Sequence, residues 1–231
     1  MDVLIRVVLE LLLMLTGMVI RYFQHANFRK RSPLVRFWAK KRGFGYQSKG
    51  EIASLPKLKC TKYLRKGANS KAYHVVTGKL GDVRFTMLDV EYRSGNSSLD
   101  LYKYRTLFLI HSPIKFSSEV WIRPAHLIED IPGALGISNI QFESKEFSDK
   151  FHVKSENKKF AWGVVHQLLM AILLDHPKTT LEYCESTICM TLGDSLVRPK
   201  YLSRFWDYGK EVWELTPEYL VEELKLKSEA A

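Results

Sequence analysis

An apolar stretch near the amino terminus constrains this chain more than any other feature of its sequence. Residues 3–20 read VLIRVVLELLLMLTGMVI, eighteen residues that are almost wholly aliphatic. A helix needs about 20 such residues to cross the hydrocarbon core of a bilayer. Only Arg6 and Glu10 interrupt the stretch, and their i,i+4 spacing lets them pair on one helical face. The stretch therefore predicts a transmembrane anchor over residues 1–21.

The residues after this stretch predict the orientation of the anchor. A cleaved secretory signal would end in small residues, whereas Arg21, Tyr22 and Phe23 follow directly. This basic and aromatic edge favours an uncleaved anchor over a signal peptide or a buried helix. Residues 21–42 contain eight Lys or Arg and no acidic residue, and such a segment is retained on the cytoplasmic side. We therefore expect a single-pass membrane protein with its amino terminus outside and its carboxyl-terminal domain in the cytoplasm.

The charge is concentrated in the first part of the chain. The 231 residues include 35 Lys or Arg and 25 Asp or Glu, a net charge of +10. Residues 1–66 hold 15 basic and 3 acidic residues, whereas residues 67–231 hold 20 and 22. A hydrophobic fraction of 46% excludes a disordered tail, a fibre and a disulfide-rich miniprotein. The pattern predicts a basic juxtamembrane helix and linker over residues 22–66, followed by a soluble domain over residues 67–231.

The basic juxtamembrane residues are the candidate lipid-binding site. Ser32-Pro33 and Gly43 predict a short helix over residues 33–42, in which Leu34, Phe37 and Trp38 share an apolar face. Each Lys or Arg close to an anionic leaflet contributes about 1 kcal/mol. Two alternatives remain, a solvated segment docked on the body and nucleic-acid binding through residues 21–66. We name the eight residues the basic collar: Arg21, Arg29, Lys30, Arg31, Arg36, Lys40, Lys41 and Arg42.

The remaining chain predicts an α+β domain. Period-two alternation predicts four strands in an antiparallel meander, over residues 71–79, 83–92, 102–110 and 119–123. Residues 44–70 read as a linker. Helical and turn patterns then predict a buried helix over residues 160–174, a hairpin of residues 180–184 and 187–191, and amphipathic helices over residues 201–215 and from Thr216-Pro217 onward.

No sequence motif identifies a reaction. The chain lacks a phosphate-binding glycine loop, a nucleophile elbow, a zinc-protease motif and a CxxC pair, so we expect no metal and no cofactor. His111 and His126 are the candidate catalytic residues, because both follow predicted strands and Asp89 could join them for general acid–base chemistry. The alternative to a catalytic role is that each histidine lies in a loop with its hydrogen bonds already made. Cys184 and Cys189 are interpreted as structural cysteines, since no zinc-site spacing includes them or Cys60.

Several phrases between residues 85 and 193 resemble an uncharacterised bacterial family, classified as a domain of unknown function, in which membrane segments precede a soluble domain. The family pattern combines FDYxY-, LRPE- and EFSxRF-like phrases. The chain departs from it at Ala125 and at residues 88–90. The resemblance implies an anchored α+β architecture and carries over no catalytic residue. Its phrases here are FTMLDVEY from Phe85, WIRP from Trp121, IQFES from Ile140, EFSDKFHV from Glu146 and LEY from Leu181.

These observations predict a membrane-anchored cytoplasmic module that binds an unknown protein or small molecule. The basic collar would contact anionic lipid. The alternatives are a membrane-tethered hydrolase using the histidines and a carboxylate, and the nucleic-acid binding described above.

Overall fold

The computed structural model describes residues 2–51, 70–93, 102–126 and 137–217. Their core is an eight-stranded antiparallel sheet with the order β1-β2-β3-β4-β8-β7-β5-β6. The strands are β1 Gly45–Gly50, β2 Lys71–Leu80, β3 Val83–Arg93, β4 Tyr102–His111, β5 Val120–Pro124, β6 Phe151–Lys154, β7 Thr179–Cys184 and β8 Thr187–Leu192. The helices are α1 Asp2–Lys41, α2 Lys145–Lys150, α3 Lys158–Val164, α4 Gln167–Asp175 and α5 Leu202–Glu214, with a short 3₁₀ turn at Pro199–Tyr201 before α5.

The predicted pairing of the first two meander strands and the predicted hairpin of residues 180–184 and 187–191 are confirmed. Strands β2 and β3 pair around Gly81, which has the positive φ that such a turn requires. Strands β7 and β8 pair from Thr179 and Leu192 to Cys184 and Thr187, on either side of the Glu185-Ser186 turn. Alternating side chains on these strands place apolar residues on both faces of the sheet, and both faces are buried.

The predicted meander is wrong at its fourth strand. Strands β2, β3 and β4 are neighbours in the sheet, but the β7–β8 hairpin lies between β4 and β5. The connection from β4 to β5 crosses the tip of this hairpin, where the Ser112 amide donates a hydrogen bond to the Ser186 carbonyl. The predicted linker is also wrong in part, because residues 45–50 pair with β2 as an edge strand. The rest of that predicted linker, residues 52–69, lies outside the described residues.

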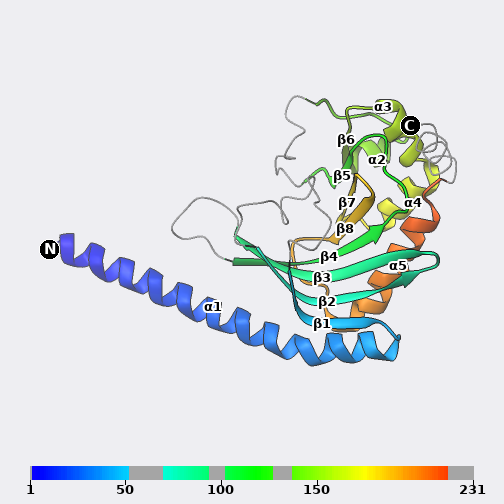
Figure 1. Cartoon of the computed structure of the whole chain (residues 1–231). Coiled ribbons are helices and arrows are strands. Elements are labelled where there is room, and N and C mark those ends of the chain that lie inside the picture. Colours follow the sequence, from blue (N-terminus) through cyan, green and yellow to red (C-terminus); the bar gives the residue numbers. More distant parts are fainter. Residues whose placement is uncertain (1, 52–69, 94–101, 127–136, 218–231) are drawn as a thin grey trace.

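One face of the sheet carries the main core, which helices cover (Figure 1). Phe205 and Val212 of α5 and Leu169 and Leu173 of α4 pack into it. The predicted helix over residues 160–174 is two helices, α3 and α4, which are separated at Val165 and His166. The predicted helix over residues 201–215 is confirmed as α5, whereas the final predicted helix lies outside the described residues.

Helix α1 is a continuous 40-residue helix that projects from the body at its amino-terminal end (Figure 1). Its last part corresponds to the helix predicted over residues 33–42, but Pro33 lies inside α1 and does not begin a new helix. A proline removes one backbone hydrogen bond, and packing of α1 on β1 and β2 holds this part of the helix in place.

The expected transmembrane anchor is wrong. In the part of the chain that the structure describes, no helix combines the length and the apolar character needed to cross a bilayer. Arg6 and Glu10 interrupt the apolar stretch, and the helix does not end near residue 21 but continues to Lys41. The prediction of a single-pass membrane protein, with its amino terminus outside and its domain in the cytoplasm, is wrong for the same reason.

Candidate functional site

A buried ion pair attaches α1 to the sheet. The Arg31 Nε atom lies 2.6 Å from the Asp89 Oδ2 atom on β3, and both side chains are almost fully buried. A second guanidinium nitrogen donates to Asp89 Oδ1 at 3.1 Å, and the third donates to the Val197 carbonyl. Thr106 on β4 donates to the same carboxylate at 2.6 Å. Arg31 and Asp89 thus neutralise each other, as buried charges must.

Apolar contacts extend this attachment along one side of α1. Phe28, Arg31, Val35 and Ala39 are all buried, and their spacing of three, four and four residues places them on one helical face. Trp38 lies beside this face and donates from its indole nitrogen to Ser203 Oγ at 3.0 Å. Because these contacts fix the rotation of α1 about its axis, they also determine which side chains point away from the body.

The outward face of α1 combines basic and apolar side chains. Leu34 is 54% exposed and Phe37 is 69% exposed. Lys30 and Lys41 flank them along the same row, at spacings of four, three and four residues. Arg36 and Lys40 are also exposed beside this row. We define the outward face as Lys30, Leu34, Arg36, Phe37, Lys40 and Lys41.

The amino-terminal part of α1 continues this exposed surface with aliphatic side chains. Nine of them between residues 5 and 19 are 47–69% exposed, because the helix stands away from the body here (Figure 1). An exposed apolar surface of this extent indicates a contact site. The nine residues are Ile5, Val7, Val8, Leu9, Leu12, Met14, Leu15, Met18 and Val19.

The structure divides the predicted basic collar. Lys30, Arg36, Lys40 and Lys41 lie on the outward face. Arg31 points inward and binds Asp89, so it is not available to a lipid. The sequence contains no signal that separates Arg31 from its neighbours other than its position on the helix.

The remaining collar residues have other environments. The guanidinium of Arg42 lies 4.7 Å from the centre of the Trp206 ring and within 4.0 Å of Asp207 on α5, so this side chain packs against the body. The side chains of Arg21 and Arg29 lie outside the part of the structure that is described.

The three candidate catalytic residues do not form a cluster. His111 pairs with Arg84 across β3 and β4, and Asp89 lies five residues further along β3, about 17 Å away at the usual rise per residue. Asp89 faces α1, whereas His111 lies on the other face of the sheet and bonds Thr86 at 2.9 Å. Strand β5 begins at Val120, near the hairpin tip and His111. His126 is exposed and follows the other end of this strand.

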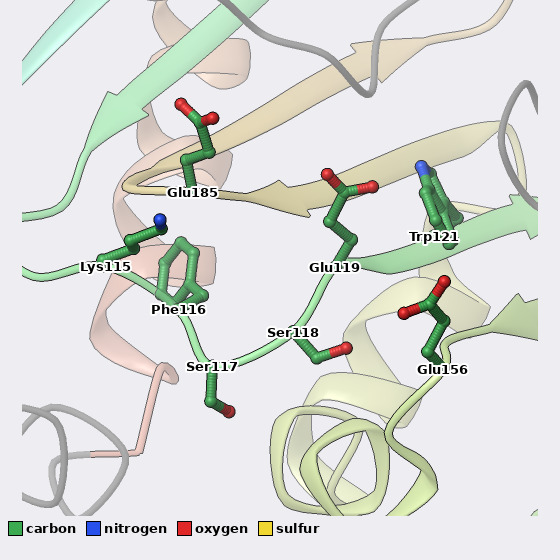
Figure 2. A pocket seen from close by; sticks show the side chains of 8 residues that line it. All are labelled: Lys115, Phe116, Ser117, Ser118, Glu119, Trp121, Glu156 and Glu185. Atoms are coloured by element: carbon green, nitrogen blue, oxygen red, sulfur yellow. The ribbon is translucent and has the colours of Figure 1, made fainter.

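A separate pocket of about 370 Å³ lies at the tip of the β7–β8 hairpin (Figure 2). Glu119, Glu156 and Glu185 contribute three carboxylates to its lining, and Lys115 contributes one ammonium group. Glu119 accepts a hydrogen bond from the Cys184 thiol at 3.3 Å. Within the described residues, no group of three or more His, Cys, Asp or Glu side chains could hold a metal ion.

Sequence reasoning missed one residue at the attachment of α1. His74 on β2 is 4% exposed and its Nδ1 atom lies 4.0 Å from Asp89 Oδ2. Its φ of +49° is the unusual left-handed conformation. The alternation of residues 71–79 gave no sign of this irregularity, since it arises from a register shift against β3.

The two described cysteines, Cys184 and Cys189, are free and buried. Burial raises the pKa of the Cys189 thiol, and the neighbouring Glu182 carboxylate adds to this effect. A protonated, buried thiol is a poor nucleophile, which agrees with the interpretation of Cys189 as a structural cysteine.

Comparisons with known proteins identify a structural neighbour. No family model and no curated protein matches the chain. The crystal structure of the mycobacterial trehalose monomycolate transport factor A, TtfA, is similar with a TM-score of 0.60 and 14% sequence identity, over 82% of this chain and 97% of that chain. At this level of identity the likeness shows a shared fold.

Proposed function

We propose that this chain is a docking module that binds an anionic lipid surface through the outward face of α1. The observation that carries the proposal is the exposure of Leu34 and Phe37 between basic residues, on a helix whose opposite face is fixed to the sheet. An interfacial helix has this composition, with apolar side chains that enter the acyl boundary and Lys or Arg that contact the headgroups. The domain would then be held in one orientation relative to the lipid.

The charges of the outward face supply the attraction. Each of Lys30, Arg36, Lys40 and Lys41 contributes about 1 kcal/mol next to an anionic leaflet. Burial of a Leu or Phe side chain adds about 1.5 to 3 kcal/mol. The structural neighbour is named as a transport factor for a glycolipid, trehalose monomycolate, and this supports a lipid-related role for the shared fold.

Vesicle binding tests the proposal. The full chain is sedimented with phosphatidylcholine vesicles that contain or lack phosphatidylglycerol. The triple variant Lys30→Gln, Lys40→Gln, Lys41→Gln is expected to bind the anionic vesicles roughly 100-fold more weakly, since it loses about 3 kcal/mol. The control variant Lys145→Gln, Lys158→Gln, Lys159→Gln removes the same charge from exposed positions on α2 and α3 and should bind as the parent does.

A second variant separates lipid insertion from simple charge attraction. Leu34→Gln with Phe37→Gln keeps every charge and is expected to weaken vesicle binding at high salt, where electrostatic attraction is screened. Equal binding by the charge variant and its control would contradict the proposal. So would preferential, strongly salt-dependent binding of a single-stranded oligonucleotide, which would favour nucleic acid as the partner of residues 21–66.

A further inference from the structure

His74 lies at the junction between α1 and the sheet. Its ring centre is 4.5 Å from that of Phe28 on α1, and its Nδ1 atom is 4.0 Å from the Asp89 carboxylate that holds Arg31. Within the described residues, neither ring nitrogen of His74 has a hydrogen-bond partner. A buried polar group without a partner is costly, so this imidazole requires an explanation.

The backbone of His74 is also unusual. It lies in a register shift between Tyr73 and Val76, and its φ of +49° falls in the left-handed region. Non-glycine residues seldom adopt this conformation, and such strain is concentrated at functional and switch positions. Strain and an unpartnered imidazole therefore coincide at one residue of the α1 junction.

The charged groups around His74 oppose one another. Asp89 on β3 attracts a protonated imidazole, whereas Arg31 on α1 repels it. Burial also disfavours the protonated form, and its effect is larger than that of either charge. The pKa of His74 is consequently lowered from its ordinary value, with burial as the largest cause. Among the described residues, the phenols of Tyr46 on β1, Tyr73 on β2 and Tyr104 on β4 contact His74 or Phe28. The buried Glu91 lies on the same face of β3 as Asp89, two residues further along the strand.

We propose that His74 is a pH-sensitive switch that loosens the attachment of α1 to the sheet when its imidazole is protonated. A protonated His74 places a second positive charge beside Arg31, and both compete for the Asp89 carboxylate. Moving residues 28–41 away from the sheet admits water to the imidazole and relieves both the repulsion and the burial. The position of α1 can be followed without lipid.

Amide hydrogen exchange of the full chain tests the switch. Protection of residues 28–41, corrected for the intrinsic pH dependence of exchange, is compared between about pH 7.5 and about pH 5, on either side of the ordinary histidine pKa of about 6.5. In the parent chain this protection should fall by up to about tenfold for each pH unit below about 6.5.

Two substitutions distinguish the switch from general acid sensitivity. His74→Asn keeps a residue type that tolerates positive φ and removes the titration, so α1 protection should become independent of pH. His111→Asn changes a histidine of the same sheet that bonds Thr86, and it should leave the parental loss of protection intact. A parental loss that persists in His74→Asn, or no loss in the parent, would overturn the proposal.

A direct titration covers the case in which His74→Asn does not fold. The imidazole resonance of His74 in the parent chain is followed by NMR together with the amide resonances of residues 28–41. The two midpoints should coincide. Midpoints that differ would overturn the proposal, because another group would then control the movement of α1.

Discussion

Arg31 shows how one side chain in a uniformly basic segment acquires a different role. Arg29, Lys30 and Arg31 are consecutive, and the sequence assigns all three to lipid contact. The 100° turn per helical residue points Arg31 toward the sheet. Its guanidinium donates hydrogen bonds there to Asp89, Thr106 and the Val197 carbonyl. The planar, multiply donating guanidinium suits this buried position better than an ammonium group would.

Removal of Arg31 should therefore lower the free energy of unfolding. Arg31→Met leaves the Asp89 carboxylate buried without its main partner, and breaking a buried ion pair costs about 3 to 5 kcal/mol. Urea denaturation measures the free energy of unfolding. Lys30→Met removes an equal charge from the exposed neighbour and should change this free energy by less than about 0.5 kcal/mol. Equal effects of the two substitutions would show that the buried pair contributes nothing specific.

At the scale of elements, helix α5 and the β7–β8 hairpin could be predicted, whereas their places in the fold could not. Both were predicted from periodicity and turn residues, because each depends on neighbours in sequence. The sequence did not predict that this hairpin inserts between β4 and β5. The insertion depends on the pairing of Phe108 with Met190 and of Ile122 with Leu181, which are far apart in sequence. Helix α5 then crosses β4 so closely that only a glycine fits at residue 209.

Gly209 provides the test at this scale. A Cβ atom there would lie 2.5 Å from Phe108 Cε1 and 2.8 Å from two other ring atoms, and Phe108 is fully buried. Overpacking costs about 1 to 3 kcal/mol, and three ring contacts this short place the cost in the upper part of that range, above the gain of about 1 kcal/mol from replacing a helical glycine. Gly209→Ala should thus lower the melting temperature. Lys210→Ala, at an exposed site on the same helix, should leave it nearly unchanged.

At the scale of the whole molecule, the buried His74 and the half-buried His111 make the free energy of unfolding sensitive to pH. Burial lowers the pKa of His74 and of His111, and Arg84 adds to the effect at His111. The unfolded chain therefore binds more protons than the folded chain once the pH falls below about 6.5, the ordinary pKa of histidine. The free energy of unfolding should decrease from there until the pH is below both folded-state pKa values.

Urea denaturation between about pH 7.5 and about pH 5.5 measures this decrease, which is at most about 1.4 kcal/mol per pH unit for each histidine. The double variant His74→Asn, His111→Asn should have a flatter profile than the parent. His126→Asn, at an exposed position after β5, serves as the control and should keep the parental slope. A parental profile without a decrease would contradict the lowered pKa of these two histidines in the folded chain.

The sequence by itself determined the elements that depend on local order. Its period-two runs and turn residues set both hairpins, its amphipathic spacing set α5, and the concentration of charge in residues 1–66 placed the basic surface on α1. Local patterns suffice here because a helix, or two strands joined by a tight turn, is formed by segments that are adjacent in sequence.

Only the tertiary structure decided how these elements meet. It placed the β7–β8 hairpin between β4 and β5, turned Arg31 inward to Asp89, and separated His111 from His126. It also corrected the expected membrane anchor, since residues 3–20 belong to a helix that continues to Lys41 and docks on the sheet. The physical reason is that strand order and buried charge pairing depend on contacts between residues distant in sequence, which no local pattern encodes.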